Sequence, residues 1–564
     1  MQITIDGKKV KIKNGTTILE AAEKAGIKIP TLCYHPDLKP EGRCGICIVE
    51  ANGKIMTSCN NKISDGMVIQ TNTENIRKQR KINAQLIGCN FEKEEEFKKW
   101  LALEELPDID ELKFKSKPSE LIDESCHDIV MDFTKCIMCG RCVQKCRDLQ
   151  TVNAICYSKR ANGTIVGKSL GKKLINTTCV GCGQCSLVCP TGAIKEKEYI
   201  EDIKKLLKDK KYHVIAQTAP SIRVAIGEEF SMPAGSLVTG KMVSTLRKVG
   251  FSKIFDTNFG ADLTIMEEAS ELIDRIKNKK LLPQITSCCP GWVNFVEIFY
   301  PEILPHLSSC KSPHQMFGAI LKTYYAKKVG INPKNIILVS IMPCTAKKYE
   351  SCREEMVIDG IKDVDYVITT REAAKLIKSF NIDLSKEEDS EFDNPMGRGS
   401  GGGAIFGTSG GVMESAIRTA YYFLTGYDYP KIEFKSIRGD KGIRETSIKI
   451  GDTKLNLAIV HTLSNARKVI ETIKKNPNKY HFIEIMACPG GCIGGGGQPK
   501  PTTRDIIKKR SSAIYKEDKN LKIRQAHKNP QIIELYKTFL DKPLGEKSRK
   551  YLHTTYNDRS KCSR

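Results

Sequence analysis

Two dense groups of cysteines constrain this chain more than any other feature of its sequence. Each group has three cysteines spaced three residues apart and a fourth cysteine four residues further on. The groups are Cys136, Cys139, Cys142 and Cys146, and Cys179, Cys182, Cys185 and Cys189. With this spacing one loop presents three thiolates to a cubane, while the fourth thiolate crosses to the other cluster. Residues 126–204 are therefore predicted to fold around two [4Fe–4S] clusters, although Arg147 follows the first group where a proline is usual.

A third cysteine set near the N-terminus predicts a cluster of a different kind. It consists of Cys33, Cys44, Cys47 and Cys59. A wide gap, a C-x-x-C pair and a distant fourth thiolate are typical of [2Fe–2S] modules of the adrenodoxin and respiratory type. A zinc site is the alternative, and the flanking sequence favours the [2Fe–2S] cluster.

The flanking sequence predicts a small β-grasp module at residues 1–75. Two alternating stretches, Gln2–Ile5 and Val10–Lys13, flank an Asp-Gly turn, which is a strong hairpin signal. Thr17 and Glu20 form a capping-box pattern ahead of a helix predicted at Ile18–Ala25. Strand, turn, strand and helix, in this order, are typical of the start of a ubiquitin-like ferredoxin fold.

The chain has 23 cysteines among 564 residues, and this count points to a reducing compartment. An odd number of cysteines cannot pair completely, and cytosolic proteins use tight cysteine spacings for metals rather than for disulfides. The N-terminus has no apolar signal core, and no run of eighteen apolar residues is present. We therefore expect a cytoplasmic protein without a membrane segment.

The formal net charge of +24 leaves three interpretations open. The charge can reflect a lysine-rich solvated surface, or a basic face that steers an acidic partner. Nucleic-acid binding is the third interpretation, but no nucleic-acid motif accompanies the charge. We expect no nucleic-acid partner.

The remaining sequence divides into a connector, a large α/β region and a tail. Residues 76–125 are predicted to form a charged helical connector without a metal site. Residues 205–525 alternate short apolar runs with helical periods, which predicts α/β layers with parallel strands. Residues 526–564 are predicted to form a polar helical tail. The strands expected in the α/β region include Val214–Ala216, Ile336–Ile341, Leu457–Val460 and Phe482–Ile485.

Three further cysteine-containing segments lie in the α/β region. They are Thr286–Trp292, Met342–Glu350 and Glu484–Pro499, and each follows an apolar run. Their cysteines would lie in loops beyond the strand ends, where open α/β sheets build their sites. The glycines around Cys492 would let the backbone approach a bulky ligand. The sequence thus predicts a cluster site assembled from three loops, with five cysteines where a cubane needs four.

These three segments, in this order, resemble the three signature motifs of the [FeFe]-hydrogenases, iron-only enzymes that interconvert protons, electrons and molecular hydrogen. The resemblance runs from the N-terminal [2Fe–2S] module to about residue 550 and is closest to the monomeric clostridial ferredoxin-dependent type. It implies a multidomain α/β protein. The expected domains are a β-grasp [2Fe–2S] ferredoxin domain (1–75), the helical connector (76–125), a bacterial 2[4Fe–4S] ferredoxin domain (126–204), a two-lobed α/β H-cluster catalytic domain (205–525) and the tail (526–564).

The resemblance also implies the ligands of the active site. In that family the H-cluster is a [4Fe–4S] cubane joined through one cysteine sulfur to a di-iron unit that carries carbon monoxide, cyanide and azadithiolate. By resemblance, the cubane would be held by Cys289, Cys344, Cys488 and Cys492, with Cys492 as the bridge. Dedicated maturation proteins would be needed to build the di-iron unit.

A proton path is the next implication. Glu268, Glu271 and Arg275 lie at i, i+3 and i+7 of a helical stretch and share one face, and composition alone favours a solvated face. The resemblance instead implies a relay that starts at Cys288, a thiol able to donate and accept protons. From Cys288 the relay would pass through a water, Glu268, Ser308 and Glu271 to Arg275 at the surface.

Further residues are expected around the di-iron unit. By resemblance, Lys347 would donate to one cyanide, and Ala219, Pro220 and Ser221 would line the other. An apolar wall would consist of Met342, Met486 and Phe406, although methionine is more often core filler. His314 stands where close relatives carry glutamine near a diatomic ligand. The glycine-rich run 397–411 has no Gly-Lys-Ser/Thr after it, so a packed loop is favoured over a phosphate site.

The sequence departs from many relatives in the connector. Those relatives carry a further [4Fe–4S] cluster there, bound by one histidine and three cysteines, whereas residues 76–125 hold no histidine and only Cys89. We predict that this cluster is absent and that the accessory set is one [2Fe–2S] and two [4Fe–4S] clusters. The cysteines left without a ligand role are Cys89, Cys126, Cys156, Cys288, Cys310, Cys352 and Cys562. For Cys310, simple packing is favoured over a second thiol near the site.

Two other classes of protein share parts of this pattern. A respiratory-type iron–sulfur subunit would need the histidine-ligated cluster and leaves the three loops unexplained. A non-catalytic sensor or assembly factor would lack the N-terminal module or add a regulatory domain. We expect a monomer whose electron partner is an acidic ferredoxin, because a basic chain attracts such a carrier. The alternative is a multisubunit NAD(P)-linked complex, although this chain has no flavin or dinucleotide motif.

Overall fold

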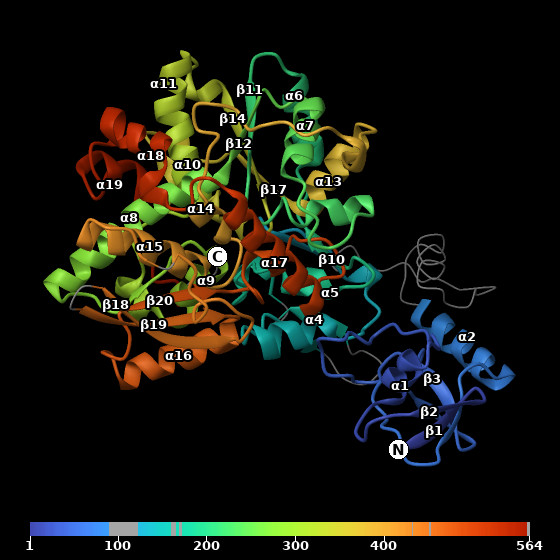
Figure 1. The fold of residues 1–564 in the computed structure, drawn as a ribbon. Coiled ribbons are helices and arrows are strands. Elements are labelled where there is room, and N and C mark those ends of the chain that lie inside the picture. Colours follow the sequence, from blue (N-terminus) through green and yellow to red (C-terminus); the bar gives the residue numbers. More distant parts are fainter. Residues whose placement is uncertain (89–121, 159–164, 169–171, 431, 451–452, 561–564) are drawn as a thin grey trace.

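The computed structural model describes residues 1–88, 122–158, 165–168, 172–430, 432–450 and 453–560. Figure 1 shows the N-terminal module as a small lobe beside a larger α/β body. None of the helices among the described residues combines the length and the apolar character that crossing a bilayer would require.

The N-terminal module is a five-stranded sheet with one short helix against it. The strand order is β2-β1-β5-β3-β4, from β1 (Gln2–Ile5), β2 (Lys8–Lys11), β3 (Ile48–Ala51), β4 (Lys54–Thr57) and β5 (Val68–Gln70). The predicted capping box is confirmed, because Thr17 and Glu20 cap helix α1 (Ile18–Lys24) reciprocally. Strand β2 begins two residues earlier than predicted, since positive φ angles at Asp6 and Gly7 close a two-residue turn.

Helix α2 (Glu74–Gly88) begins the predicted connector and is tied to the N-terminal sheet. The Arg80 guanidinium is buried and donates to the backbone oxygens of Ile46, Ile48 and Thr71. The rest of the connector up to residue 121, including Cys89, lies outside the described residues.

The two dense cysteine groups form a pseudo-repeated module. Helices α4 (Arg141–Gln144) and α5 (Gln184–Val188) each follow a left-handed glycine, Gly140 or Gly183, which lets the cysteine loop turn into the helix. The strands are β6 (Ile122–Asp123), β7 (Ile129–Asp132) and β10 (Ile194–Glu196) in one antiparallel sheet, and β8 (Ile155–Ser158) with β9 (Ile165–Lys168) in a hairpin.

The N-terminal lobe is joined to this module by side chains that reach backbone oxygens. Arg141 Nη2 donates to the carbonyl oxygens of Leu32 and Tyr34, both at 2.5 Å. Gln144 Nε2 donates to the carbonyl oxygen of Lys39 at 3.1 Å. These bonds hold the loop that contains Cys33 against the helix that contains Cys142.

Two four-stranded sheets form the α/β body. The first is fully parallel, in the order β12 (Lys253–Asp256), β11 (His213–Thr218), β14 (Ile336–Met342) and β17 (Tyr366–Thr369). The second has the order β13 (Gln284–Ile285), β20 (Phe482–Met486), β19 (Thr453–His461) and β18 (Ile443–Ile450). The predicted parallel pairing is thus found throughout except at the edge strand β18, which is antiparallel to β19.

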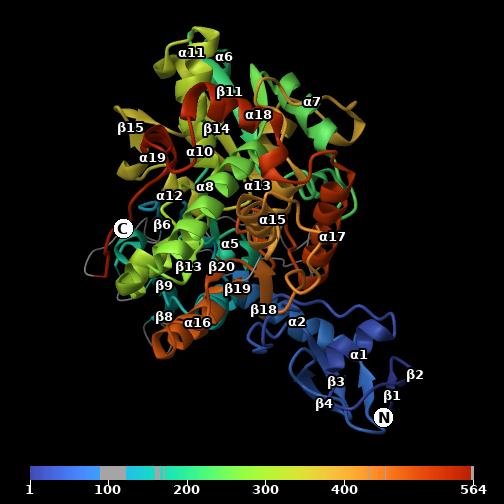
Figure 2. The same cartoon turned by 60° about the vertical axis from the view of Figure 1, so that its left-hand side comes forward.

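Helices separate and cover the sheets. The long helix α8 (Thr257–Asn278) packs against α10 (Pro313–Ile320) and α15 (Gly411–Thr425), and Figure 2 shows it crossing the body between the sheets. The glycine-rich run contains a short helix, α14 (Gly401–Ile405), which begins where the Ser400 hydroxyl accepts from the Gly403 N–H. Further helices are α6 (Ile200–Lys208), α7 (Thr239–Val249), α9 (Pro290–Phe299), α11 (Ala326–Val329), α12 (Ala346–Glu350), α13 (Thr370–Ser379), α16 (Leu463–Lys475) and α17 (Arg504–Asn520).

Residues 530–559, called the C-terminal strap here, return across the body. The strap contains α18 (Pro530–Leu535) and α19 (Glu546–Leu552), and its apolar side chains enter the main core. After α19 it runs beside residues 308–311, where the Thr554 N–H donates to the Ser309 oxygen at 2.8 Å and the Tyr556 hydroxyl donates to the Ser308 oxygen at 2.7 Å.

Candidate active site

The cysteines of the three motif segments lie in loops after strand ends, as predicted. Cys289 directly precedes α9 after strand β13, and Cys344 lies between β14 and α12. Cys488 and Cys492 follow β20. The two sheets therefore direct the carboxyl ends of their strands toward one region, where four thiols from three loops meet.

Electrostatic effects show that these four thiols are close neighbours. Burial, and then the nearby Cys289 and Cys492, raise the pKa of Cys344 above its usual range. Burial, and then Cys344 and Cys289, do the same to the pKa of Cys488, and burial with Cys289 raises the pKa of Cys492 to about 12. Four thiols that oppose each other's ionisation, two of them buried (Cys344 and Cys488) and two half-buried (Cys289 and Cys492), suit a cationic iron–sulfur centre, because a bound metal reverses this effect and deprotonates its thiols.

Glycines of the third motif bring two cluster loops into contact. A Cβ atom on Gly496 would lie 2.4 Å from the Cys182 carbonyl oxygen, and one on Gly495 would lie 2.3 Å from the Pro343 oxygen. Only glycine fits at such distances. The loop that contains Cys492 therefore touches both the Cys344 loop and the second dense cysteine group.

A charged network surrounds Cys288. Lys347 Nζ donates to the Cys288 carbonyl oxygen at 3.0 Å and to the Glu350 carboxylate at 2.8 Å. The same Glu350 oxygen accepts from Ser312 Oγ at 3.0 Å and from His314 Nε2. Although burial opposes ionisation, Lys347 and then His314 lower the pKa of Glu350 to about 2. Glu350 is therefore a permanent carboxylate that fixes the ammonium of Lys347 beside the site.

Sequence reasoning did not assign a role to Glu350. It lies inside the second motif, three residues after Lys347 on helix α12, and this spacing was an available signal. His314 is buried and neutral, because burial and the charge of Lys347 lower its pKa to about 4.

The predicted proton path lies on a buried face of α8, so the solvated-face interpretation is wrong. Glu268 is 1% exposed, and burial, followed by Glu271, raises its pKa to about 8. Ser308 Oγ donates to Glu271 Oε2 at 2.7 Å, and Arg275 Nη2 donates to Glu271 Oε1 at 2.7 Å. Glu268 also acts electrostatically on Cys288. The structure thus brings together all five residues of the predicted relay.

One part of that prediction is corrected. Arg275 does not lie at the surface, because it is only 8% exposed. Besides Glu271, its guanidinium donates to the backbone oxygens of Leu281, His306 and Leu307. These carbonyl oxygens enclose the positive charge of Arg275 at the C-terminal end of α8.

The expected apolar wall is buried, and polar atoms beside it lack partners. The wall residues Met342, Met486 and Phe406 all belong to the main core. Among the described residues, the buried atoms without a hydrogen-bond partner include Thr218 Oγ1, Ser221 Oγ, Glu268 Oε2 and His314 Nδ1. Buried polar atoms ordinarily have a partner. Together with the thiols, these atoms fit a cluster with polar ligands held between the loops, next to Ala219 and Pro220, which precede Ser221.

The accessory cysteines also assemble in sets. A small cavity is lined by Cys136, Cys139, Cys142 and Cys189, which is the crossed arrangement expected for the first cubane. Burial, and then Cys179 and Cys146, raise the pKa of Cys182. In the N-terminal lobe, hydrogen bonding from Cys44 lowers the pKa of Cys33 to about 6, and hydrogen bonding from Cys59 lowers that of Cys47 to about 7.

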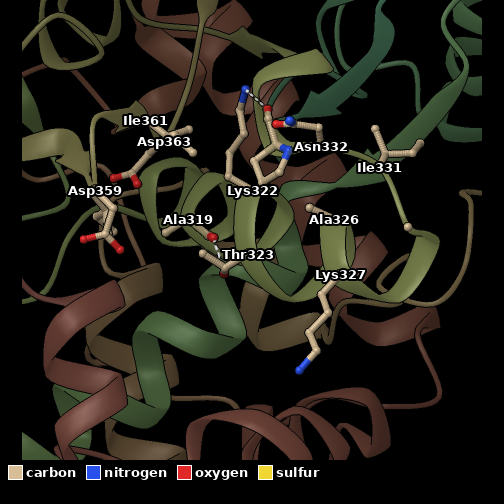
Figure 3. Close-up of a pocket in the computed structure, with 13 residues that line it drawn as sticks. Ala319, Lys322, Thr323, Ala326, Lys327, Ile331, Asn332, Asp359, Ile361 and Asp363 are labelled. Carbon is tan, nitrogen blue, oxygen red and sulfur yellow. Dashed lines mark hydrogen bonds between the residues drawn. The ribbon is translucent and has the colours of Figure 1, made fainter.

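Two places that could rival the cysteine site offer no comparable chemistry. Cys310 is buried, and its Sγ lies 3.9 Å from Glu271 Oε2, so it packs beside the relay. A separate pocket of about 460 Å³ lies between α11 and the hairpin of β15 (Val357–Ile358) and β16 (Ile361–Lys362), as Figure 3 shows. Its Lys322 is paired with Asp365, and none of its lining residues was predicted to have a functional role.

Of the other cysteines without a ligand role, Cys126 is buried, Cys156 is half-buried, Cys352 is exposed, and Cys562 lies outside the described residues.

Comparisons with protein families match four parts of the chain. A model described as "Iron only hydrogenase large subunit, C-terminal domain" matches residues 212–496, and one described as "Iron hydrogenase small subunit" matches residues 504–559. A 2Fe-2S iron-sulfur cluster binding domain matches residues 1–74, and a 4Fe-4S binding domain matches residues 173–195.

Individual proteins are similar over the whole chain. The NADP-reducing hydrogenase subunit HndD of Solidesulfovibrio fructosivorans is 42% identical over 100% of this chain and 99% of its own length. Iron hydrogenase 1 of Clostridium pasteurianum is 42% identical over 98% of this chain and 99% of its own length. Among solved structures, apo [FeFe]-hydrogenase HydA1 from Chlamydomonas reinhardtii superimposes with a TM-score of 0.58 at 41% identity, over 64% of this chain and 99% of that chain.

Proposed function

Because the chain belongs to the iron-only, or [FeFe], hydrogenase family, we propose that it reversibly converts protons and electrons from reduced ferredoxin into molecular hydrogen. Membership makes it an oxidoreductase acting on hydrogen, with [2Fe–2S] and [4Fe–4S] clusters and the H-cluster as cofactors. The observation that carries the proposal is the meeting of four buried or half-buried thiols from three strand-end loops beside Cys288 and Lys347.

We assign the cubane of the H-cluster to Cys289, Cys344, Cys488 and Cys492, which would hold it between the three loops. When bound, the H-cluster supplies the iron chemistry that forms and cleaves the H–H bond. Lys347, held by Glu350, presents a positive charge toward the site, where cyanide ligands are anionic. Ala219, Pro220 and Ser221 offer a polar lining on the other side, and Met342, Met486 and Phe406 exclude water.

The accessory ligands form an electron route from the N-terminal lobe. The [2Fe–2S] cluster is assigned to Cys33, Cys44, Cys47 and Cys59. The two [4Fe–4S] clusters are assigned to Cys136, Cys139, Cys142 and Cys189, and to Cys179, Cys182, Cys185 and Cys146. The proposal is supported by the contact between Gly496 and the Cys182 loop, which leaves no intervening layer between the last accessory site and the catalytic loop.

Protons are proposed to reach Cys288 along α8. Glu268 holds a proton near neutral pH because its pKa is raised to about 8, and a protonated carboxyl can donate. The Ser308 hydroxyl, which bonds to Glu271, can pass a proton between the two carboxyl groups because a hydroxyl donates and accepts at once. Arg275 orients the Glu271 side chain through their ion pair.

The electron partner is proposed to be an acidic ferredoxin, and the site of action the cytoplasm. A net charge of +24 would attract an acidic carrier. Cysteine clusters of this kind also need reduced thiols, which a cytoplasm supplies. The same chain could instead serve as the catalytic subunit of an NADP-linked assembly, since the relative HndD is named as an NADP-reducing hydrogenase subunit.

The test uses the full chain co-expressed with hydrogenase maturation proteins. Hydrogen evolution is measured by gas chromatography with reduced ferredoxin, with NADPH alone as the comparison, and infrared spectra report carbon monoxide and cyanide bands. The expected result is evolution with ferredoxin and not with NADPH alone. Carbon monoxide and cyanide bands without any hydrogen turnover would refute the catalytic proposal, and turnover only after addition of partner subunits and NADPH would favour the NADP-linked assembly.

A further inference from the structure

A second hydrogen-bonded branch leaves Glu271 in the direction of the C-terminal strap. Ser309 Oγ donates to Glu271 Oε1 at 3.2 Å and lies 2.8 Å from His553 Nδ1. His553 Nε2 lies 3.0 Å from Glu267 Oε2. The Tyr536 hydroxyl donates to the other oxygen of Glu267. A continuous line of donors and acceptors thus joins the relay carboxylate to a histidine on the strap.

The end of the relay at Arg275, which is the end far from Cys288, cannot supply protons. An arginine guanidinium does not lose its proton in proteins. Here its four terminal N–H groups are also occupied, by Glu271 and three backbone oxygens. A group that titrates near neutral pH is needed to feed Glu271, and histidine is the side chain suited to that task.

Glu267 fixes the His553 ring in place on the far side from Ser309. Glu267 is fully buried, and within the described residues its ion-pair partner is His553, with no lysine or arginine against it. Its other bonds come from the Tyr536 hydroxyl and from the Leu544 N–H at 2.8 Å. A buried carboxylate is costly unless it is paired and hydrogen-bonded, and these three bonds hold Glu267, and with it the His553 ring, in one position.

We propose that His553 delivers protons to Glu271 through the Ser309 hydroxyl, as a second limb of the proton path. This inference rests on the proposed hydrogenase function of the relay. It assigns to the strap a role beyond packing.

The proton balance of the step is simple. The His553 Nδ1–H bond breaks as its proton binds the Ser309 oxygen, and the original Ser309 O–H bond breaks as its proton binds Glu271 Oε1. An imidazolium and a carboxylate become a neutral imidazole and a carboxylic acid, and no electrons move. Afterwards the Ser309 hydroxyl donates to the bare Nδ1. The proton lost from His553, a half-buried residue of the strap, is replaced from solvent.

Several titratable groups face this branch and would contribute to its pH dependence. From α8 they are Glu267, Glu271 and, behind Glu271, Arg275. From the segment before α10 comes Cys310, whose Sγ points at Glu271, and from the strap comes Tyr536, which bonds to Glu267. A pH profile of one variant alone is therefore insufficient, and matched variants are required.

The first experiment measures hydrogen evolution by the matured holoenzyme with reduced methyl viologen, which removes dependence on the protein carrier. His553→Gln and Ser309→Ala are each expected to lower the rate about 10²-fold, at the low end of the range for a lost proton-transfer group, because Arg275 cannot replace this limb. Ser309→Thr, which keeps the hydroxyl, should retain most of the rate. The double variant should lose no more than either single variant, since both act on one limb.

The matched control is His213→Gln, which alters a half-buried histidine that is bonded to Tyr325 and remote from Glu271. It should leave the rate and its pH profile unchanged. A wild-type rate and pH profile in His553→Gln would overturn the proposal. Losses that multiply in the double variant would overturn it as well.

Chemical rescue separates proton delivery from a structural role. His553→Gly leaves space for imidazole, and added imidazole is expected to restore a large part of the rate. A lowered thermal midpoint with no rescue by imidazole would show that His553 only holds the strap, and the proposal would fail.

A final measurement does not depend on hydrogen turnover. In protein made without maturation proteins, nuclear magnetic resonance follows the His553 ring signals against pH, in wild type and in Glu271→Gln. Removing the Glu271 charge should move the midpoint of that titration to lower pH. An unmoved midpoint refutes the branch alone, whereas matured wild type that evolves no hydrogen refutes the proposed function.

Discussion

Replacing Glu268 with glutamine tests the centre of the proton path. The side chain is fully buried, and its pKa is raised from 4.5 to about 8, chiefly by burial and then by Glu271. That shift corresponds to roughly 5 kcal/mol of opposition to ionisation. Near neutral pH the carboxyl is therefore about 90% protonated, and it can give a proton toward Cys288 and regain one from the Ser308 side. Glutamine has nearly the same shape but cannot exchange a proton.

We expect Glu268→Gln to lower hydrogen evolution by roughly 10²- to 10³-fold, within the range of a lost proton-transfer group. Gas chromatography with reduced methyl viologen gives the rate, and iron analysis verifies that the clusters are loaded. Asp274→Asn is the control, because Asp274 is exposed on the same helix. Near-normal turnover in a fully loaded Glu268→Gln variant would show that protons take another way.

The same substitution has a predicted effect on stability. Below about pH 4.5 the Glu268 carboxyl is protonated in both states, but between about 4.5 and 8 only the folded state keeps the proton. The stability that this proton confers is lost as the pH rises through 8. Thermal midpoints of wild type and Glu268→Gln should thus agree near pH 5, and the variant should be the more stable near pH 9. A variant that is less stable at pH 9 would contradict the raised pKa.

Three other predictions follow from the cluster sites and their supports. Matured protein should contain about 16 iron atoms per chain, and iron analysis giving about 20 would reveal a further cubane in the connector. Glu350→Gln should cost about 3–5 kcal/mol, because it leaves the Lys347 ammonium buried without its carboxylate, and a thermal midpoint equal to that of wild type would argue against this. Arg141→Ala removes the bonds to Leu32 and Tyr34. The variant should lose its N-terminal lobe faster during proteolysis. Its turnover should be slower with ferredoxin but unchanged with methyl viologen. Equal slowing with both donors would show that the contact between the lobe and the cysteine module is not the cause.

Short-range spacing carries most of what the sequence can predict here. The cysteine groups, the capping box at Thr17 and the strands before the motif loops depend on residues close in the chain, and the structure reproduces them. The shared face of Glu268, Glu271 and Arg275 was also predictable from helical periodicity. Its burial was not, because burial depends on helices α10 and α15, which pack against α8 from distant parts of the sequence.

Contacts between segments far apart in the chain explain which features of the site could not be predicted from the sequence. Ser309 and His553 are more than two hundred residues apart, and neither lies in a recognisable motif. Arg275 was expected at the surface, yet backbone oxygens from residues 281, 306 and 307 enclose it. Every residue has a backbone carbonyl whatever its side chain. Residue types alone therefore could not predict that backbone oxygens enclose Arg275.

The C-terminal strap has a consequence for how such a protein can be divided between genes. It is held by burial of its helices in the core and by backbone bonds to residues 308–311, which are the kinds of contact that also join separate subunits. Because the strap is part of the same chain, its effective concentration beside the core is high, but the contacts themselves do not depend on that covalent link. A strap made as an independent polypeptide could therefore bind the same core residues through the same contacts, and the match of residues 504–559 to an iron hydrogenase small subunit is consistent with that division.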